Sequence, residues 1–134
     1  MRSLDQHIII TNIDLERLQP VIEQHDTPAS DSLEDELARA VVVDQRAVPG
    51  DVVTMNSDVV YEDLDTGVRR KVKVVYPKDA DAPRGHVSVL APIGSALLGL
   101  RVGQTIEWTV PNGTRRVRVI EIPYQPEASG DYAL

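Results

Sequence analysis

The apolar positions of this chain change their spacing near residue 49, from a helical period to a strand period. In the first 48 residues they recur three and four positions apart, at Leu15, Leu18 and Ile22 and again at Leu33, Leu37 and Val41. This spacing predicts two amphipathic helices, each with one apolar face. Residues 26–32 between them are rich in turn-forming types. Two helices of about a dozen residues most simply form an antiparallel hairpin, a short coiled coil about 18 Å long.

The ends and the interior of these predicted helices carry further signals. Thr11 is a suitable N-cap for the first helix and Ser32 for the second, because a hydroxyl can accept a hydrogen bond from a free N–H group of the first turn. Pro20 lies inside the first pattern and removes its hydrogen bond to Glu16, so we expect a kink or an early break there. Pro49 and Gly50 then end the helical pattern.

After this boundary the period becomes two, which predicts short strands. The predicted strands are residues 51–55, 58–64, 68–77, 87–90, 105–110 and 114–124. Residues 64–67 (LDTG) and 110–113 (VPNG) are predicted hairpin turns. A short helix is expected around residues 96–100, where leucines precede and follow Gly99. The chain is therefore predicted to be of the α+β class, with a helical domain at residues 1–48 and an antiparallel sheet domain at residues 49–134.

Three positions in the predicted strands stand out. Arg70 interrupts the apolar alternation of Val72 and Val74. The apolar phase shifts at residues 119–120, which predicts a β-bulge. Trp108, the only tryptophan, shares its predicted face with apolar neighbours and is expected in the core.

Charge separates the two halves of the chain. Residues 1–48 hold 4 basic and 10 acidic residues, and residues 49–134 hold 10 basic and 11 acidic residues. The acidic half is unsuited to coating a nucleic acid backbone, because that takes Lys and Arg. The chain has no cysteine and no apolar run of about 18 residues, which suits a cytoplasmic protein that does not span a membrane.

The residue patterns required for several kinds of chemistry are missing. The three histidines (His7, His25 and His86) lie in separate segments without the spacing of metal ligands. The glycines of residues 94–103 lack the elements of a phosphate-binding loop. No serine lies in a nucleophile elbow. We therefore expect no catalytic residue and no bound metal or other cofactor.

Basic residues of two strands share the open face of the predicted sheet. They are Arg69, Lys71 and Lys73, with Arg116 or Arg118 nearby. They indicate either a solvated face balanced by acids or a docking surface for an acidic partner. Direct contact with nucleic acid is not expected, because the chain has no Phe and few aromatic residues to stack on bases.

Three segments carry a resemblance to a known family. They are residues 51–64 (DVVTMNSDVVYEDL), 87–113 (with APIGSALLGLRVG at 91–103) and 124–134 (YQPEASGDYAL). Together they resemble the bacterial regulators of nucleoside diphosphate kinase, which are small relatives of the GreA/GreB transcript cleavage factors. The resemblance implies a helical hairpin followed by an FKBP-like domain, and binding to the core of RNA polymerase near its secondary channel.

The same resemblance suggests which residues meet the polymerase. The expected docking residues are Ala91, Pro92, Ile93 and Gly94. The hairpin tip expected at the channel comprises Asp26, Thr27, Pro28, Ser30 and Asp31. A Gre coiled coil is far longer than this hairpin, so we expect competition with Gre factors without strong transcript cleavage. We also expect a monomer.

Other functions remain open at this point. A Gre-like cleavage activity would need the acids of the tip. A peptidyl-prolyl isomerase of FKBP-like fold would need an aromatic-walled pocket, for which the chain offers few aromatic residues. The family name also leaves open whether nucleoside diphosphate kinase is contacted directly or only regulated in its level.

Overall fold

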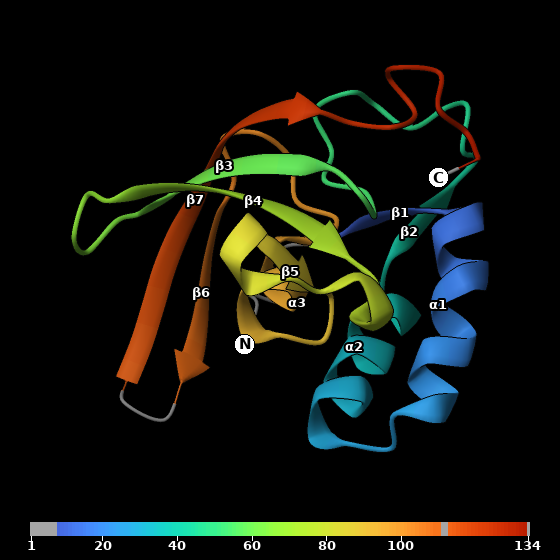
Figure 1. Ribbon diagram of the computed structural model, residues 1–134, viewed down its shortest axis with the longest axis horizontal. Helices are drawn as coiled ribbons and strands as arrows, with labels where there is room; N and C mark the ends of the chain where they lie inside the picture. Colours follow the sequence, from blue (N-terminus) through green and yellow to red (C-terminus); the bar gives the residue numbers. More distant parts are fainter. Residues whose placement is uncertain (1–7, 111–112, 134) are drawn as a thin grey trace.

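The computed structural model describes residues 8–110 and 113–133, with the backbone alone at residues 108–110. Two helices pack beside one end of a curved five-stranded sheet that carries a short third helix (Figure 1). The elements are β1 (Ile9–Thr11), α1 (Asn12–Gln24), α2 (Pro28–Ala38), β2 (Val41–Val43), β3 (Asp58–Asp63), β4 (Arg69–Val75), two 3-10 turns η1 (Pro77–Asp79) and η2 (Ala82–Arg84), β5 (His86–Ser88), α3 (Pro92–Leu97), β6 (Thr105–Val110) and β7 (Gly113–Tyr124). The α+β prediction is therefore confirmed.

The first helix begins where its cap predicts. The Thr11 side chain accepts a hydrogen bond from the Asp14 N–H at 3.0 Å, and α1 then continues past Pro20 to Gln24. Of the two alternatives expected at Pro20, the early break is therefore wrong, and the kink stays a prediction. Leu18 and Ile22, which lie on either side of Pro20, are both buried, and this packing offsets the hydrogen bond that the proline removes.

The second helix starts earlier and ends earlier than its pattern predicts. Its cap is Thr27 and not Ser32, because Thr27 and Ser30 form a reciprocal capping box of side-chain and backbone hydrogen bonds. The connection from α1 therefore shrinks to residues 25–27. At the other end α2 stops at Ala38, and Val41, expected on the buried face of the helix, is half exposed in β2.

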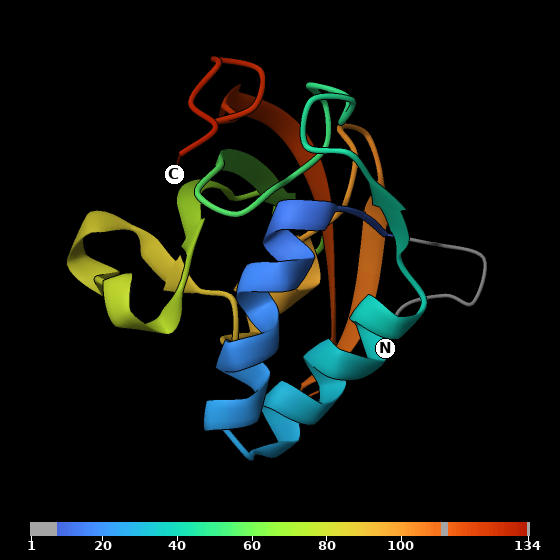
Figure 2. The same ribbon diagram turned by 90° about the vertical axis from the view of Figure 1, so that its right-hand side faces the viewer.

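A two-stranded parallel sheet that the sequence analysis missed holds the ends of the helix pair together. Strand β1 pairs with β2 in parallel, with Ile9 opposite Val41 and Thr11 opposite Val43. Helix α1 runs away from this small sheet and α2 runs back towards it, so their connection forms the lower extremity of the molecule in Figures 1 and 2. Each β-branched triplet favours strand over helix, because branching at Cβ restricts side-chain rotamers in a helix.

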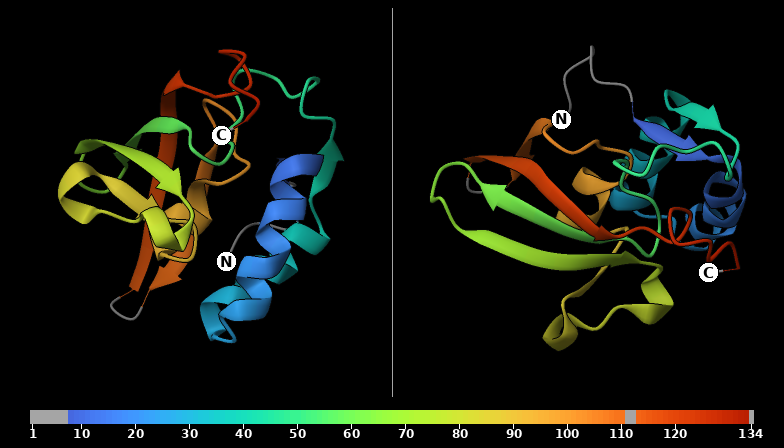
Figure 3. Two further views of the ribbon diagram at one scale, coloured as in Figure 1. Left: turned by 45° about the vertical axis from the view of Figure 1, so that its right-hand side comes forward. Right: turned by 90° about the horizontal axis from the view of Figure 1, so that it is seen from above.

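The main sheet has the strand order β5-β4-β3-β7-β6. All its pairs are antiparallel except β4–β5, which is parallel, so the sheet is mostly and not wholly antiparallel. The predicted bulge is present: Val60 lies opposite Glu121 and Tyr61 opposite Val119, which leaves Ile120 without a partner on β3. Figure 3 shows the resulting bend of β7 across the sheet.

Helix α3 covers part of one face of this sheet, against β4 and β5. Leu97, Leu98 and Leu100 are fully buried there, with Val59 and Val119 of the sheet in the same apolar cluster. Leu18 and Leu33 from the helix pair belong to that cluster as well. One apolar core therefore joins the helix pair to the sheet, and the helix pair does not project freely from it.

Two glycines make this close packing possible. A Cβ on Gly94 would overlap the carbonyl oxygen of Ser88, so α3 approaches β5 at backbone distance. Gly99 has φ of +83°, and a Cβ there would meet the side chain of Ile8. These two positions fix how α3 and β1 lie against the main sheet.

Two predictions for residues 49–134 concern segments outside the regular strands. Residues 51–55 form no strand, only a single bridge between Val52 and Arg101, although Val52, Val53 and Met55 are buried. The loop is held by hydrogen bonds instead of a strand ladder. The side chain of Trp108 and most of the predicted turn at 110–113 lie outside the described residues. The FKBP-like assignment and the boundary at residue 48 stay predictions.

Buried polar groups link α1, the loop after Val53 and the C-terminal segment. An oxygen of Asp14 accepts a hydrogen bond from the Met55 N–H at 3.1 Å. The Thr54 hydroxyl donates to Glu127 at 2.7 Å. Burial raises the pKa of Asp14 to about 6, and the negative charge of Glu127 raises it further, whereas the Met55 hydrogen bond and the positive charge of Arg17 lower it.

Candidate functional site

Arg70, which interrupts the apolar alternation of β4, lies on the same side of the main sheet as the apolar core. Across the sheet Arg70 pairs with Tyr61, and Tyr61 pairs with the fully buried Val119. Directly opposed residues point to the same side of a sheet. Arg70 thus lies on the apolar side, but beyond the area that α3 covers, where it is exposed.

This uncovered area forms a groove of about 500 Å³, called the sheet groove below. It is lined by Tyr61, Asp63, Thr66, Val68, Arg70, Pro92, Ile93, Arg115 and Val117. Strands β3, β4 and β7 form its floor, and the first residues of α3 form one wall. Helix α3 starts there because Pro92, at its N-terminal turn, has the backbone angle that a helix start favours and needs no N–H partner.

The charges in the sheet groove are only partly compensated. Arg115 forms an ion pair with Asp63 at 3.0 Å. The pKa of Asp63 is lowered, first by hydrogen bonds from the backbone N–H groups of Asp65 and Thr66 and then by Arg115. Arg70 makes no ion pair within the part of the chain that the structure describes. The groove therefore offers one uncompensated positive charge beside apolar side chains.

The aromatic ring of the groove sits between these charges. Burial raises the pKa of the Tyr61 phenol, the charge of Asp63 also raises it, and the charges of Arg70 and Arg115 lower it. At neutral pH the phenol is therefore a neutral hydroxyl, able to donate or accept a hydrogen bond. A partner that presents carboxylates around an apolar centre complements this arrangement.

The four predicted docking residues lie at the groove wall but differ in access. Pro92 is exposed, Ala91 and Ile93 are half-buried, and Gly94 is enclosed against Ser88. Pro92 and Ile93 line the groove, whereas Gly94 acts by letting α3 pack closely. Sequence reasoning missed Tyr61, Arg70 and Arg115, and the interrupted alternation at Arg70 was the available signal.

The predicted tip residues lie together at the start of α2. Asp26, Thr27, Pro28 and Asp31 are exposed. Ser30 is buried. Its hydroxyl accepts a hydrogen bond from the Thr27 N–H at 2.9 Å in the capping box. Thr27 and Ser30 are therefore structural residues of the turn, and the two acids are the exposed charges of the tip.

Three of the five basic residues on the open face of the sheet pair with acids, and Arg118 donates to the Thr105 hydroxyl at 3.3 Å. Arg69 pairs with Glu62 at 2.9 Å, and Lys73 pairs with Asp58 at 3.3 Å. Arg116 pairs with Asp65 at 2.8 Å. These pairs favour the interpretation of a solvated, charge-balanced face over that of a docking surface.

The described residues contain no group of three or more His, Asp or Glu side chains able to hold a metal ion. Within the same residues no helix has the length and apolar character needed to cross a membrane.

Comparison with known proteins places this architecture. The family model for "Transcription elongation factor, GreA/GreB, C-term" matches residues 48–124, and that for "Rnk N-terminus" matches residues 6–43. The regulator of nucleoside diphosphate kinase of Escherichia coli (strain K12) is 44% identical over 131 residues, which cover 95% of this chain and 96% of the relative.

Gre factors match a smaller part of the chain. The transcription elongation factor GreA of Chelativorans sp. (strain BNC1) is 38% identical over 92 residues, which cover 69% of this chain and 59% of the relative. A solved structure titled prokaryotic transcription elongation factor GreA/GreB, from Nitrosomonas europaea, is 45% identical and superposes with a TM-score of 0.74 over 90% of this chain and all of that one.

The chain belongs to the GreA/GreB family of transcription elongation factors. Within this family, the proteins named regulators of nucleoside diphosphate kinase match it along almost its whole length, which confirms the resemblance found in the sequence. It is thus a Gre-related transcription factor or a regulator of that type, with the fold of the Gre factors.

Proposed function

We propose that this protein binds the core of RNA polymerase near the entrance of the secondary channel and competes there with Gre factors. The observation that carries the proposal is the sheet groove, where Pro92 and Ile93 adjoin the uncompensated charge of Arg70. Its chemistry fits an acidic, partly apolar partner surface. The family membership supports a partner in the transcription apparatus.

In this proposal the helix pair acts by occupying the channel entrance. Helix α1 has 13 residues, or about 20 Å at 1.5 Å per residue. Catalysis at a distant site needs a carboxylate within about 3 Å of its target. A pair this short, packed on the core at its base, brings Asp26 and Asp31 to the channel mouth and not to a deep active site. Strong transcript cleavage is therefore not part of the proposed function.

Charge reversal at two consecutive residues of β4 tests the docking surface. Arg70→Glu places an acid in the sheet groove, whereas Arg69→Glu makes the same change on the opposite, solvated face. We expect the affinity for core polymerase, measured by fluorescence anisotropy, to fall at least about tenfold for Arg70→Glu and less than about threefold for Arg69→Glu. Equal losses would refute the groove as the docking surface.

Two further assays separate the remaining parts of the proposal. A Gre factor added to the labelled complex should displace the protein, and failure to displace it would exclude a shared site. Backtracked elongation complexes should show no more RNA shortening with the protein than without it. Absence of polymerase binding at micromolar concentrations would refute the proposed function as a whole. Co-purification with nucleoside diphosphate kinase would instead support direct contact with that enzyme.

A further inference from the structure

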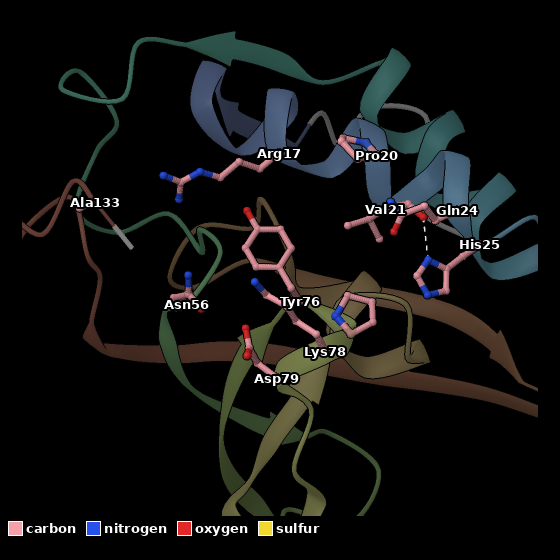
Figure 4. Close-up of a pocket in the computed structure, with 11 residues that line it drawn as sticks. Arg17, Pro20, Val21, Gln24, His25, Asn56, Tyr76, Lys78, Asp79 and Ala133 are labelled. Atoms are coloured by element: carbon pink, nitrogen blue, oxygen red, sulfur yellow. Dashed lines mark hydrogen bonds between the residues drawn. The ribbon is translucent and has the colours of Figure 1, made fainter.

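A second groove, of about 900 Å³, separates α1 from the chain that leaves β4 (Figure 4). We call it the α1 groove. It is lined by Arg17, Pro20, Val21, Gln24 and His25 of α1, by Asn56, by Tyr76, Pro77, Lys78 and Asp79, and by Ala133. None of these residues belongs to the sheet groove. The α1 groove is therefore a separate feature, which the proposed contact with polymerase does not use.

The lining combines apolar walls with an excess of hydrogen-bond donors. Pro20 and Val21 supply apolar surface from α1, and Pro77 supplies it from the chain after β4. Arg17 and Lys78 are cations, and Asp79 is the one acid among the described residues that line the groove. A positively charged lining is unusual for a chain with a net charge of −7. The lining itself therefore carries a small excess of positive charge that an anionic ligand can use, while Asp14 and Glu127 add negative charge near Tyr76.

Several donors of this lining are available to a ligand. Within the described residues, the side chains of Gln24, Asn56 and Lys78 make no hydrogen bond or ion pair. The Nδ1 atom of His25 lies 2.8 Å from the carbonyl oxygen of Val21. Because a carbonyl only accepts hydrogen bonds, Nδ1 carries the proton, and Nε2 of this tautomer is left as an acceptor for another partner. These groups surround the groove in Figure 4.

Tyr76 adds an aromatic ring at the centre of the groove. Figure 4 shows the ring between α1 and the residues of η1, with its hydroxyl directed towards α1. Burial raises the pKa of this hydroxyl, the charge of Asp14 also raises it, and Arg17 opposes both. The phenol is therefore neutral, and its ring offers a flat apolar surface beside the two prolines of the groove.

We propose that the α1 groove binds a small phosphate-bearing ligand of about nucleotide size. The volume lies within the range of roughly 300–1,000 Å³ that small-molecule sites occupy. Lys78 provides a positive charge for phosphate oxygens, and Arg17, whose guanidinium already interacts with the Tyr76 hydroxyl, adds a second cation to the lining. The ring of Tyr76 and the proline walls provide the apolar surface for a planar group, and Asp79 can accept hydrogen bonds from sugar hydroxyls. An inorganic phosphate alone would leave that apolar surface unused.

Calorimetric titration of the full-length protein tests this site with ADP, pyrophosphate and an octaglutamate peptide as probes. We expect ADP to bind with a dissociation constant of about 0.1 mM or lower, and more tightly than pyrophosphate. Lys78→Glu should weaken ADP binding at least about tenfold. The matched control is Lys71→Glu, the same charge reversal at an exposed position of β4 outside both grooves, which should change it less than about twofold.

Four outcomes would overturn the proposal. They are no ADP binding up to about 5 mM, ADP affinity no better than that of pyrophosphate, an equal loss in both variants, and binding of octaglutamate in place of ADP. Circular dichroism of both variants excludes unfolding as the cause of a loss. Polymerase binding is measured on the same Lys78→Glu protein and should be unchanged, so failure of this site and failure of the sheet groove are distinguishable.

Discussion

The buried carboxyl group of Asp14 makes the stability of this protein depend on pH in a direction opposite to that of a salt-bridged acid. The residue is 4% exposed, and the pKa of its carboxyl group is about 6 in the folded protein against 3.8 for an ordinary exposed aspartate. Between these two pH values the folded state holds more protons than the unfolded state. The free energy of unfolding therefore falls as pH rises from about 4 to about 6.

The magnitude follows from the same two values. One pH unit of difference corresponds to about 1.4 kcal/mol, so the ionised Asp14 costs about 3 kcal/mol above pH 6. Asp14→Asn removes this cost and keeps an oxygen that can accept the Met55 N–H. It also removes a charge that favours the first turn of α1 by up to about 1 kcal/mol. The stability of the variant relative to the wild type should therefore increase by about 3 kcal/mol between pH 4 and pH 7.

Urea unfolding followed by far-ultraviolet circular dichroism at intervals across this pH range measures the difference. The control is Asp31→Asn, which makes the same change in the first turn of α2 at an exposed position. Its stability relative to the wild type should vary by less than about 1 kcal/mol over the range. The reasoning is refuted if Asp14→Asn shows no pH-dependent gain, or if Asp31→Asn shows an equal one.

Three further substitutions test the packing by thermal or urea unfolding. Gly99→Ala should lower the free energy of unfolding by about 2–4 kcal/mol, because its Cβ would meet Ile8 in a strained backbone conformation. Gly103→Ala, with φ of +91° and open space around it, should lower it by only about 1 kcal/mol. Equal losses in the two variants would contradict the contact with Ile8. Leu18→Ala should cost about 2–5 kcal/mol, since that side chain is fully buried in the shared core, and a loss below about 1 kcal/mol would show that the helix pair is not anchored there. Thr27→Ala should cost about 1 kcal/mol through loss of the capping box, and an unchanged midpoint would argue against the cap.

The sequence predicted correctly those strands in which apolar and polar residues alternate regularly. The strands β3, β4, β6 and β7 and the bulge near Ile120 follow alternation, because each has one face on the core. Short apolar runs were ambiguous. Val41 continues a helical spacing and also begins a β-branched triplet, and only its pairing with Ile9 decides between the two.

The candidate site was predictable only in part. Pro92 and Ile93 were found from their family-like segment, since both lie near each other in the chain. Arg70 and Arg115 come from separate strands and meet through the register of β3 with its two neighbours. The spacing of residues along one strand does not say which residues of another strand lie opposite it, and on the β7 side the bulge near Ile120 shifts the register as well. The α1 groove was missed for the same reason: its walls are some 60 residues apart in the chain.

The parallel pairing of β1 with β2 limits how far the helix pair can move relative to the main sheet. A segment tied to the rest of a protein by one connection can pivot about it, but here both ends of the segment are fastened at the same place. Strand β1 is also fixed by the Ile9 N–H donating to the carbonyl of Gly99 at 3.1 Å, and the chain after β2 by Gln45 donating to the carbonyl of Tyr132 at 3.0 Å. These contacts together oppose pivoting of the helix pair about its base. The distance over which the tip can act is therefore set by the number of helical turns, and lengthening α1 and α2 by whole turns is the only change that would extend it without loosening the base.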